Sequence, residues 1–177
     1  MLRSHCLSAV ALLSLLAMAC SAQSQEPKKL PPGPMVEGGR STLQAKDLRL
    51  DLLQYSGTAA RLTPSADPAL DYTPGDSLIE RSADTFYHLG DLDLRLRVEG
   101  TSAWSDYSTA YRRKQVRVLA SDASTFSADL SSSLPDDTPV TVVRTWVVKR
   151  GHLHLTFTLT NRTQKPVHVG GVGIPMV

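Results

Sequence analysis

The chain has 177 residues, a formal net charge of +2 and two cysteines. Its length suits one domain around a single apolar core. Its near-neutral charge of mixed sign excludes the nucleic-acid-binding class, which needs a concentrated basic face. Both cysteines lie within the first 20 residues, so the rest of the chain has no pair for a disulfide. No motif in the sequence predicts a cofactor or a metal ion.

Residues 1–19 are expected to be a signal peptide. Arg3 supplies the positive start, Leu7–Ala19 form an apolar run, and Ala17–Ala19 offer a small-x-small cleavage pattern. The run is shorter than the roughly 20 apolar residues that span a bilayer. The sequence therefore predicts an exported protein, located in the periplasm, at the outer membrane or outside the cell.

Cys20 directly follows this pattern and resembles the lipid-modified cysteine of a bacterial lipobox. The leucine of this motif, Leu16, lies one place further from the cysteine than usual, and Ala17 occupies its slot. Lipidation of Cys20 would tether the protein by acyl burial, at about 0.8 kcal/mol per CH₂. Ordinary cleavage at the same alanine is the alternative. A lipid anchor is the only membrane attachment that we expect.

Residues 20–42 are predicted to be a linker. This stretch is rich in proline and glycine and has few large apolar residues. It cannot bury enough surface to offset its chain entropy, so an extended tether is expected. The folded domain is expected over residues 43–177.

Alternation of apolar and polar residues predicts the strands of this domain. The clearest are Gly90–Val98 and His152–Thr160, in which leucines alternate with charged or polar residues. Val140–Lys149 precedes the second of these across Arg150–Gly151, so the two are expected to form a hairpin. Only Ser77–Ala83 has a helical pattern. Weaker strands are predicted at Leu48–Gln54, Ala59–Thr63, Gln115–Leu119, Thr125–Leu130 and Val167–Val172.

Several short strands separated by turn residues are typical of an all-β fold, here an antiparallel β-sandwich. The chain ends in the apolar segment Gly173–Val177, whereas domain termini are usually solvated. We therefore expect the sandwich to be incomplete at its C-terminus. A final edge strand is the alternative.

Gly75–Leu78 spells the motif of an esterase and lipase family whose nucleophile is the serine, here Ser77. That chemistry needs a serine directly after a buried strand, with a histidine base and an acid in an α/β fold. The motif instead follows Asp71–Pro74, a turn-like segment, and no later Asp-x-x-His pair exists. A Pro–Gly turn with Asp76 capping a short helix is the better interpretation. No catalytic residue is predicted.

His152 and His154 project from one face of their predicted strand, and His168 could join them from a neighbouring strand. Three imidazoles suit zinc, but no cysteine or carboxylate completes the set, so a solvated face is the better interpretation. Asp91 and Asp93 are interpreted as outward-facing residues beside arginines of the same strand. A basic cluster is interpreted as solvated charge; its members are Arg112, Arg113, Lys114 and Arg117.

Trp104, Tyr107 and Tyr111 are the candidate carbohydrate contacts, because exposed aromatic rings stack on sugar rings. Core packing is the alternative, and it is favoured for Trp104 and for Trp146 since tryptophan is usually buried. Gly170–Gly173 lacks the helix and the GK[ST] pattern of a phosphate loop. A bulge or tight bend is predicted there.

Two stretches resemble a known family. The first joins Glu80–Arg97 to Trp104–Thr109, and the second joins Arg144–Trp146 to Leu155–Asn161 and Val167–Met176. They resemble the N-terminal β-supersandwich of large exported proteins with a glycoside-hydrolase-like, six-hairpin build (domain of unknown function 5695). The resemblance covers residues 43–177. It implies an (α/α)6 toroid after the sandwich, with the acid/base carboxylates in the toroid.

The leading hypothesis is therefore a non-catalytic N-terminal fragment of an exported carbohydrate-active protein. Its expected partners are a polysaccharide or glycan and the missing (α/α)6 domain, and the whole protein is expected to be a glycoside hydrolase. No toroid is present in the sequence, so the resemblance transfers no catalytic residue. The alternative is a self-sufficient lipoprotein module that binds a glycan or a protein partner.

Overall fold

The computed structural model describes residues 38–73, 78 and 86–175. Within these ranges the chain is all-β, with short antiparallel strands and a single 3-10 turn, as the sequence predicts. The elements are β1 Arg40–Gln44, β2 Leu48–Leu53, β3 Ala59–Pro64, β4 Asp93–Val98, β5 Ser105–Ser108, β6 Arg117–Ser121, β7 Thr125–Asp129, η2 Ser131–Ser133, β8 Val140–Lys149, β9 His152–Asn161 and β10 Val167–Gly173. No helix in these ranges is long and apolar enough to cross a membrane.

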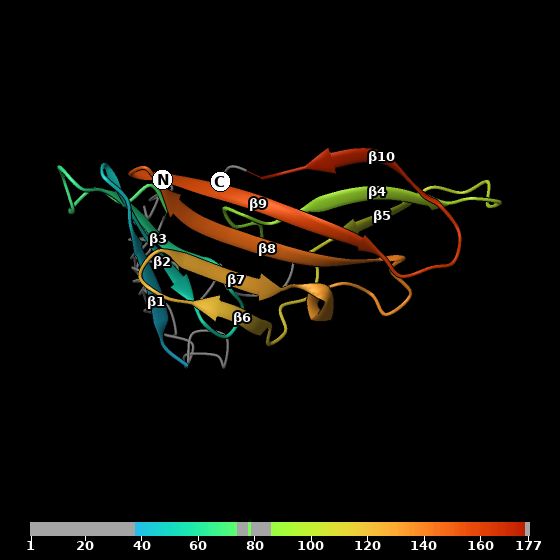
Figure 1. Cartoon of the computed structure of the whole chain (residues 1–177), viewed down its shortest axis with the longest axis horizontal. Coiled ribbons are helices and arrows are strands. Elements are labelled where there is room, and N and C mark those ends of the chain that lie inside the picture. Colours follow the sequence, from blue (N-terminus) through green and yellow to red (C-terminus); the bar gives the residue numbers. More distant parts are fainter. Residues whose placement is uncertain (1–37, 74–77, 79–85, 176–177) are drawn as a thin grey trace, which may run out of the picture.

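The strands form three antiparallel sheets. Their orders are β1-β2-β3, β10-β4-β5 and β6-β7-β8-β9. Figure 1 shows β8 and β9 running along the long axis, with β1–β3 at one end and β4, β5 and β10 toward the other. Because β10 pairs with β4 rather than with β9, the chain changes sheet after β9. This crossing gives the sandwich-like arrangement.

The core lies between these sheets. Leu94 and Leu96 of β4 are buried with Phe126 of β7 and with Val142 and Trp146 of β8 in one apolar cluster. The predicted alternation of β4 is confirmed, since its leucines face this cluster and its arginines face outward. The burial of Trp146 is confirmed as well. Removal of apolar area from water holds these sheets together, at roughly 25 cal/mol per Å².

The predicted hairpin of β8 and β9 is confirmed. The strands pair from Val140 opposite Asn161 to Lys149 opposite His152. Arg150 has φ 52° and Gly151 φ 80°, so both turn residues are in the left-handed region. Two such residues suit the right-handed twist of the flanking strands.

Three elements differ from the sequence-based expectation. β4 begins at Asp93 rather than at Gly90, because the N–H of Asp91 bonds to His88 O at 3.0 Å and closes a turn. β5 was not predicted, since its short sequence carries no apolar alternation. β1 begins at Arg40, within the segment assigned to the linker. Of the predicted helix at residues 77–83 only Leu78 is described, and it is buried with Leu53.

Candidate functional site

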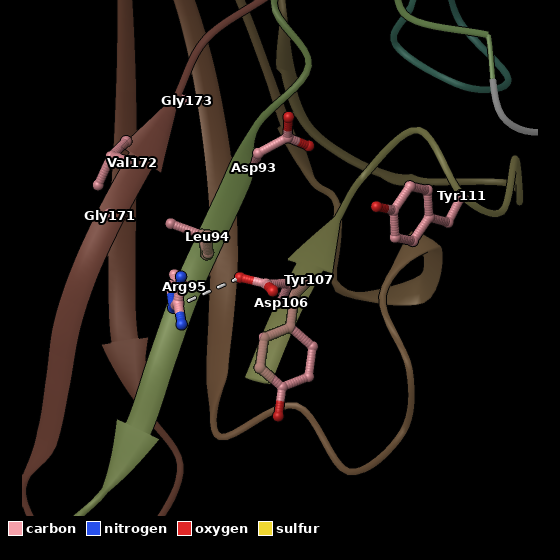
Figure 2. A pocket seen from close by; sticks show the side chains of 9 residues that line it. All are labelled: Asp93, Leu94, Arg95, Asp106, Tyr107, Tyr111, Gly171, Val172 and Gly173. Atoms are coloured by element: carbon pink, nitrogen blue, oxygen red, sulfur yellow. Dashed lines mark ion pairs between the residues drawn. The ribbon is translucent and has the colours of Figure 1, made fainter. Parts of the chain in front are cut away.

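A shallow hollow on the outer face of the β10-β4-β5 sheet is the candidate site. Its volume is about 410 Å³, within the range of small-ligand sites. We call it the glycine trough, shown in Figure 2. The residues that line it are Asp93, Leu94, Arg95, Asp106, Tyr107, Tyr111, Gly171, Val172 and Gly173.

The strand register explains why this face is hollow. Gly173 lies opposite Asp93, and Gly171 lies opposite Arg95, so at these two positions β10 contributes backbone but no side chain. A Cβ on Gly173 would lie 3.3 Å from the Cβ of Asp93, and one on Gly171 would lie 3.6 Å from the Cβ of Arg95. A larger residue at either glycine would therefore fill the trough.

Charged side chains line the trough from β4 and β5. Arg95 lies opposite Asp106, and the Nε of Arg95 is 4.0 Å from the Oδ1 of Asp106. Both side chains are exposed, so this pair adds little to stability. Asp93 lies at one end, and its Oδ1 is enclosed without a hydrogen-bond partner among the described residues. Two carboxylates against one guanidinium leave the trough with a negative balance of charge.

Two tyrosines stand at the Asp93 end. Figure 2 shows the Tyr111 hydroxyl turned toward the Asp93 carboxylate. The Tyr87 hydroxyl lies close to the side chains of Ser108 and Tyr111. Burial raises the pKa of Tyr87, and the charge of Asp93 adds to this effect, although the Ser108 side chain opposes it. Tyr87 therefore keeps its proton at neutral pH. The sequence analysis missed Tyr87. It did name Tyr107, which lines the trough and packs half-buried against the core.

Trp104 lies beyond the other end of the trough, and the prediction that it packs in the core is wrong. It is 36% exposed, and its ring centroid lies 4.9 Å from Cζ of Arg97. The ring also covers Gly170, where a Cβ would come within 2.5 Å of Trp104 Cζ3. The β10–β4 register shifts between Val169 and Gly171, which confirms the predicted bulge. The bulged glycine thus makes room for an aromatic ring on the outer face.

Asp91 is buried, and the interpretation of it as an outward-facing residue of a strand is wrong. It lies before β4 and accepts hydrogen bonds from Nη1 and Nη2 of Arg113, at 2.7 and 2.6 Å. The backbone N–H of His88 donates at 2.7 Å and the hydroxyl of Thr109 at 3.1 Å. The side chain of Arg113 is only 4% exposed. Arg113 therefore departs from the solvated cluster to which the sequence assigned it.

Arg144 completes this buried cluster, and the sequence analysis did not single it out. Its guanidinium donates to Gly90 O at 2.7 Å and also to Gly57 O. Burial lowers the pKa of Arg144 to about 10, although the charge of Asp91 opposes this, so it stays charged at neutral pH. The sequence does carry a signal for it, since Arg144 occupies an inward position of β8, between Val142 and Trp146.

The histidines do not converge. His152 and His154 are exposed on β9, as interpreted. His168 lies on β10 in another sheet, where its Nε2 is 3.9 Å from Oε2 of Glu99, so it cannot join them. Across residues 38–73, 78 and 86–175, no three His, Cys, Asp or Glu side chains lie together as metal ligands would.

The other predicted residues lie apart from the trough or outside the described ranges. Arg112 donates to Leu134 O at 2.7 Å, and Arg117 pairs with Asp129 at 3.1 Å on the surface. Cys20 and Ser77 lie outside the described residues.

Comparison with known proteins places the chain in a family. A family model described as a family of unknown function, DUF5695, matches residues 51–177. This range contains the whole trough, both tyrosines and Trp104. No curated protein and no solved structure matches the chain. Because the match covers more than half of its residues, the chain belongs to the family of unknown function DUF5695.

Proposed function

We propose that the chain is a non-catalytic β-sandwich region of an exported carbohydrate-active protein, and that the glycine trough binds a saccharide. The observation that carries this is the combination of an open glycine floor with exposed rings and carboxylates on one sheet face. Sugar rings present apolar faces that stack on aromatic side chains. Their hydroxyls donate hydrogen bonds to carboxylates, which fixes their orientation.

The burial of Asp91 supports a binding role over a catalytic one. A general acid or base must come within hydrogen-bond reach of the substrate. Burial by itself would raise the pKa of Asp91, but the hydrogen bonds and charge of Arg113, together with Arg144, outweigh it and hold this pKa below its ordinary value. Asp91 is thus an enclosed group that is ionised at neutral pH and stabilises the sandwich.

Binding and turnover can be measured separately. The full chain is incubated with insoluble polysaccharides, and the bound fraction is compared with that of Trp104→Ala and Tyr111→Ala. Retention of the wild type with loss in both variants supports the proposal. Release of reducing ends by the chain alone, or equal retention of all three proteins, contradicts it.

An apolar opening where the sheets meet supports a protein partner as well. It has a volume of about 430 Å³ and lies along the edge of β9. We propose that the helical toroid implied by the family resemblance covers it. The residues that line the opening are Leu48, Leu62, Leu89, Trp146, Leu153, Leu155 and Ile174.

Export and lipidation at Cys20 form the last part of the proposal. Expression in a Gram-negative host with labelled palmitate should give a labelled, membrane-associated chain. Cys20→Ser should lose the label and leave the membrane fraction, because the acyl chains supply the anchoring energy. An unlabelled wild-type chain cleaved at Ala19 would support ordinary secretion instead.

A further inference from the structure

The outer face of β4 forms one continuous line from the trough to Trp104. Asp93, Arg95 and Arg97 alternate with buried leucines, so all three point outward. Arg97 lies four positions after Asp93 along the strand, which corresponds to about 13 Å. Tyr111 stands at the first end, and Trp104 covers Arg97 at the second. Such a line is longer than a single sugar ring.

The charges along this line are already arranged in pairs. Arg95 lies opposite Asp106 at 4.0 Å, and the guanidinium of Arg97 lies against the Trp104 ring. Asp93 has no cation opposite it, because its partner on β10 is Gly173. An incoming carboxylate or sulfate would therefore meet the unpaired negative charge of Asp93 at one end and an arginine already paired with Asp106 in the middle. At the other end Arg97 packs on Trp104, and its Nε is enclosed and has no hydrogen-bond partner among the described residues.

The hydrogen-bond acceptors on this face are the carboxylates of Asp93 and Asp106, and ligand hydroxyls can donate to them. The Asp106 carboxylate is exposed, whereas Asp93 Oδ1 is enclosed, so a ligand can meet only the other oxygen of Asp93. That oxygen, Oδ2, lies on the side of Gly173, 3.6 Å from where a Cβ would be. Ligand hydroxyls are the donors that this end of the trough can receive.

On the basis of the proposed function, we propose that this face binds an uncharged oligosaccharide lying along β4. One sugar ring packs against the exposed part of Trp104, and another lies over Gly171 and Gly173 with hydroxyls donating to Asp93 and Asp106. The ligand class is thus a stretch of neutral glycan chain rather than a single sugar or an acidic polymer.

Calorimetric titration of the full chain tests this proposal. The probes are gluco-, xylo- and manno-oligosaccharides from monosaccharide to hexasaccharide, with galacturonan oligosaccharides of matching length as the acidic series. Affinity should rise with chain length in a neutral series and then level off once the line is filled. The acidic series should bind at least about tenfold more weakly than the best neutral series, which corresponds to about 1.4 kcal/mol in binding free energy.

Three variants locate the ligand. Trp104→Ala should remove the gain with chain length, while Trp104→Phe should restore part of it because a ring is retained. Gly171→Val should lower the affinity for the longer oligosaccharides about tenfold, because its side chain fills the floor of the trough. Loss of one central contact in an interface has an effect of this size. Thr158→Val, on the exposed face of β9, is the matched control and should bind as the wild type does. Thermal melts confirm that each variant is folded.

The outcomes separate the two proposals. If no saccharide of any length binds, the proposed function fails and this inference fails with it. If a monosaccharide binds as tightly as a hexasaccharide, or the acidic series binds better, the trough binds sugar but this inference is overturned. Wild-type affinity in folded Gly171→Val would overturn it as well.

Discussion

Arg113 and Asp91 form a bidentate ion pair inside the sandwich, with both terminal nitrogens of the arginine bonded to the carboxylate at 2.7 and 2.6 Å. Their side chains are 4% and 1% exposed. The pair joins the turn before β4 to the segment before β6. Because Arg144 also bonds to Gly90 O, the two arginines hold this turn from both sides.

Loss of the Asp91 charge should destabilise the fold strongly. Asp91→Asn removes the negative charge that faces both terminal nitrogens of the enclosed Arg113 guanidinium, and breaking a buried pair in this way costs about 3–5 kcal/mol. Denaturant unfolding measures the change. Asp106→Asn is the control, since its pair with Arg95 is exposed and is worth at most about 1 kcal/mol. Equal losses in the two variants would contradict a special role for the buried pair.

Stability should fall in acid through the same residue. The pKa of Asp91 is lower in the folded protein than its ordinary value, because Arg113 outweighs the effect of burial. The stabilisation is therefore complete above the unfolded-state pKa of about 4 and is lost as pH falls through the folded pKa. Unfolding free energies between pH 6 and pH 3 should decline more steeply in the wild type than in Asp91→Asn. Parallel curves would argue against this assignment.

Gly90 and Gly100 offer a matched test of packing against Trp146. Both have positive φ, 88° and 86°, so alanine is strained at each to a similar degree. At Gly90 the new Cβ would lie 2.8 Å from Trp146 Cζ2, whereas at Gly100 the nearest atom is Lys165 Nζ at 3.6 Å. Gly90→Ala should therefore lose about 1–3 kcal/mol more than Gly100→Ala, the typical cost of overpacking. Similar melting temperatures for the two variants would refute the close packing.

The apolar opening should make the isolated chain self-associate. Ile174 lines this opening and is 44% exposed, and Val172, two residues before it, is 58% exposed. Exposed apolar patches promote association. The double variant Val172→Thr, Ile174→Thr should bind less of a hydrophobic dye and elute closer to monomer size on gel filtration. Val118→Thr changes an exposed valine on another sheet and is the control. A wild-type chain that elutes as a clean monomer would count against this expectation.

The sequence predicted those parts of the fold that depend on local pattern. The leucines of β4 and the apolar residues of β9 repeat every second residue, and that period alone directs them to one side of a strand. The Arg150–Gly151 turn is equally local. β5 carried no such pattern, because its four residues pair with β4 without alternating in polarity.

The candidate site depended on contacts between distant residues. Asp91 was misplaced because its partner Arg113 lies 22 residues away, and a strand pattern contains no information about such a partner. His168 was grouped with the β9 histidines because sequence cannot show which sheet β10 joins. The trough was missed because it arises only when Gly171 and Gly173 align with Arg95 and Asp93.

The amino-acid sequence by itself determined that the chain forms antiparallel strands around an apolar core, since side-chain period and turn residues act over a few positions. Only the tertiary structure decided which polar side chains were enclosed and which formed a binding face. The physical reason is that the environment of a charge or a ring is set by strand register and sheet order, through neighbours far away along the chain.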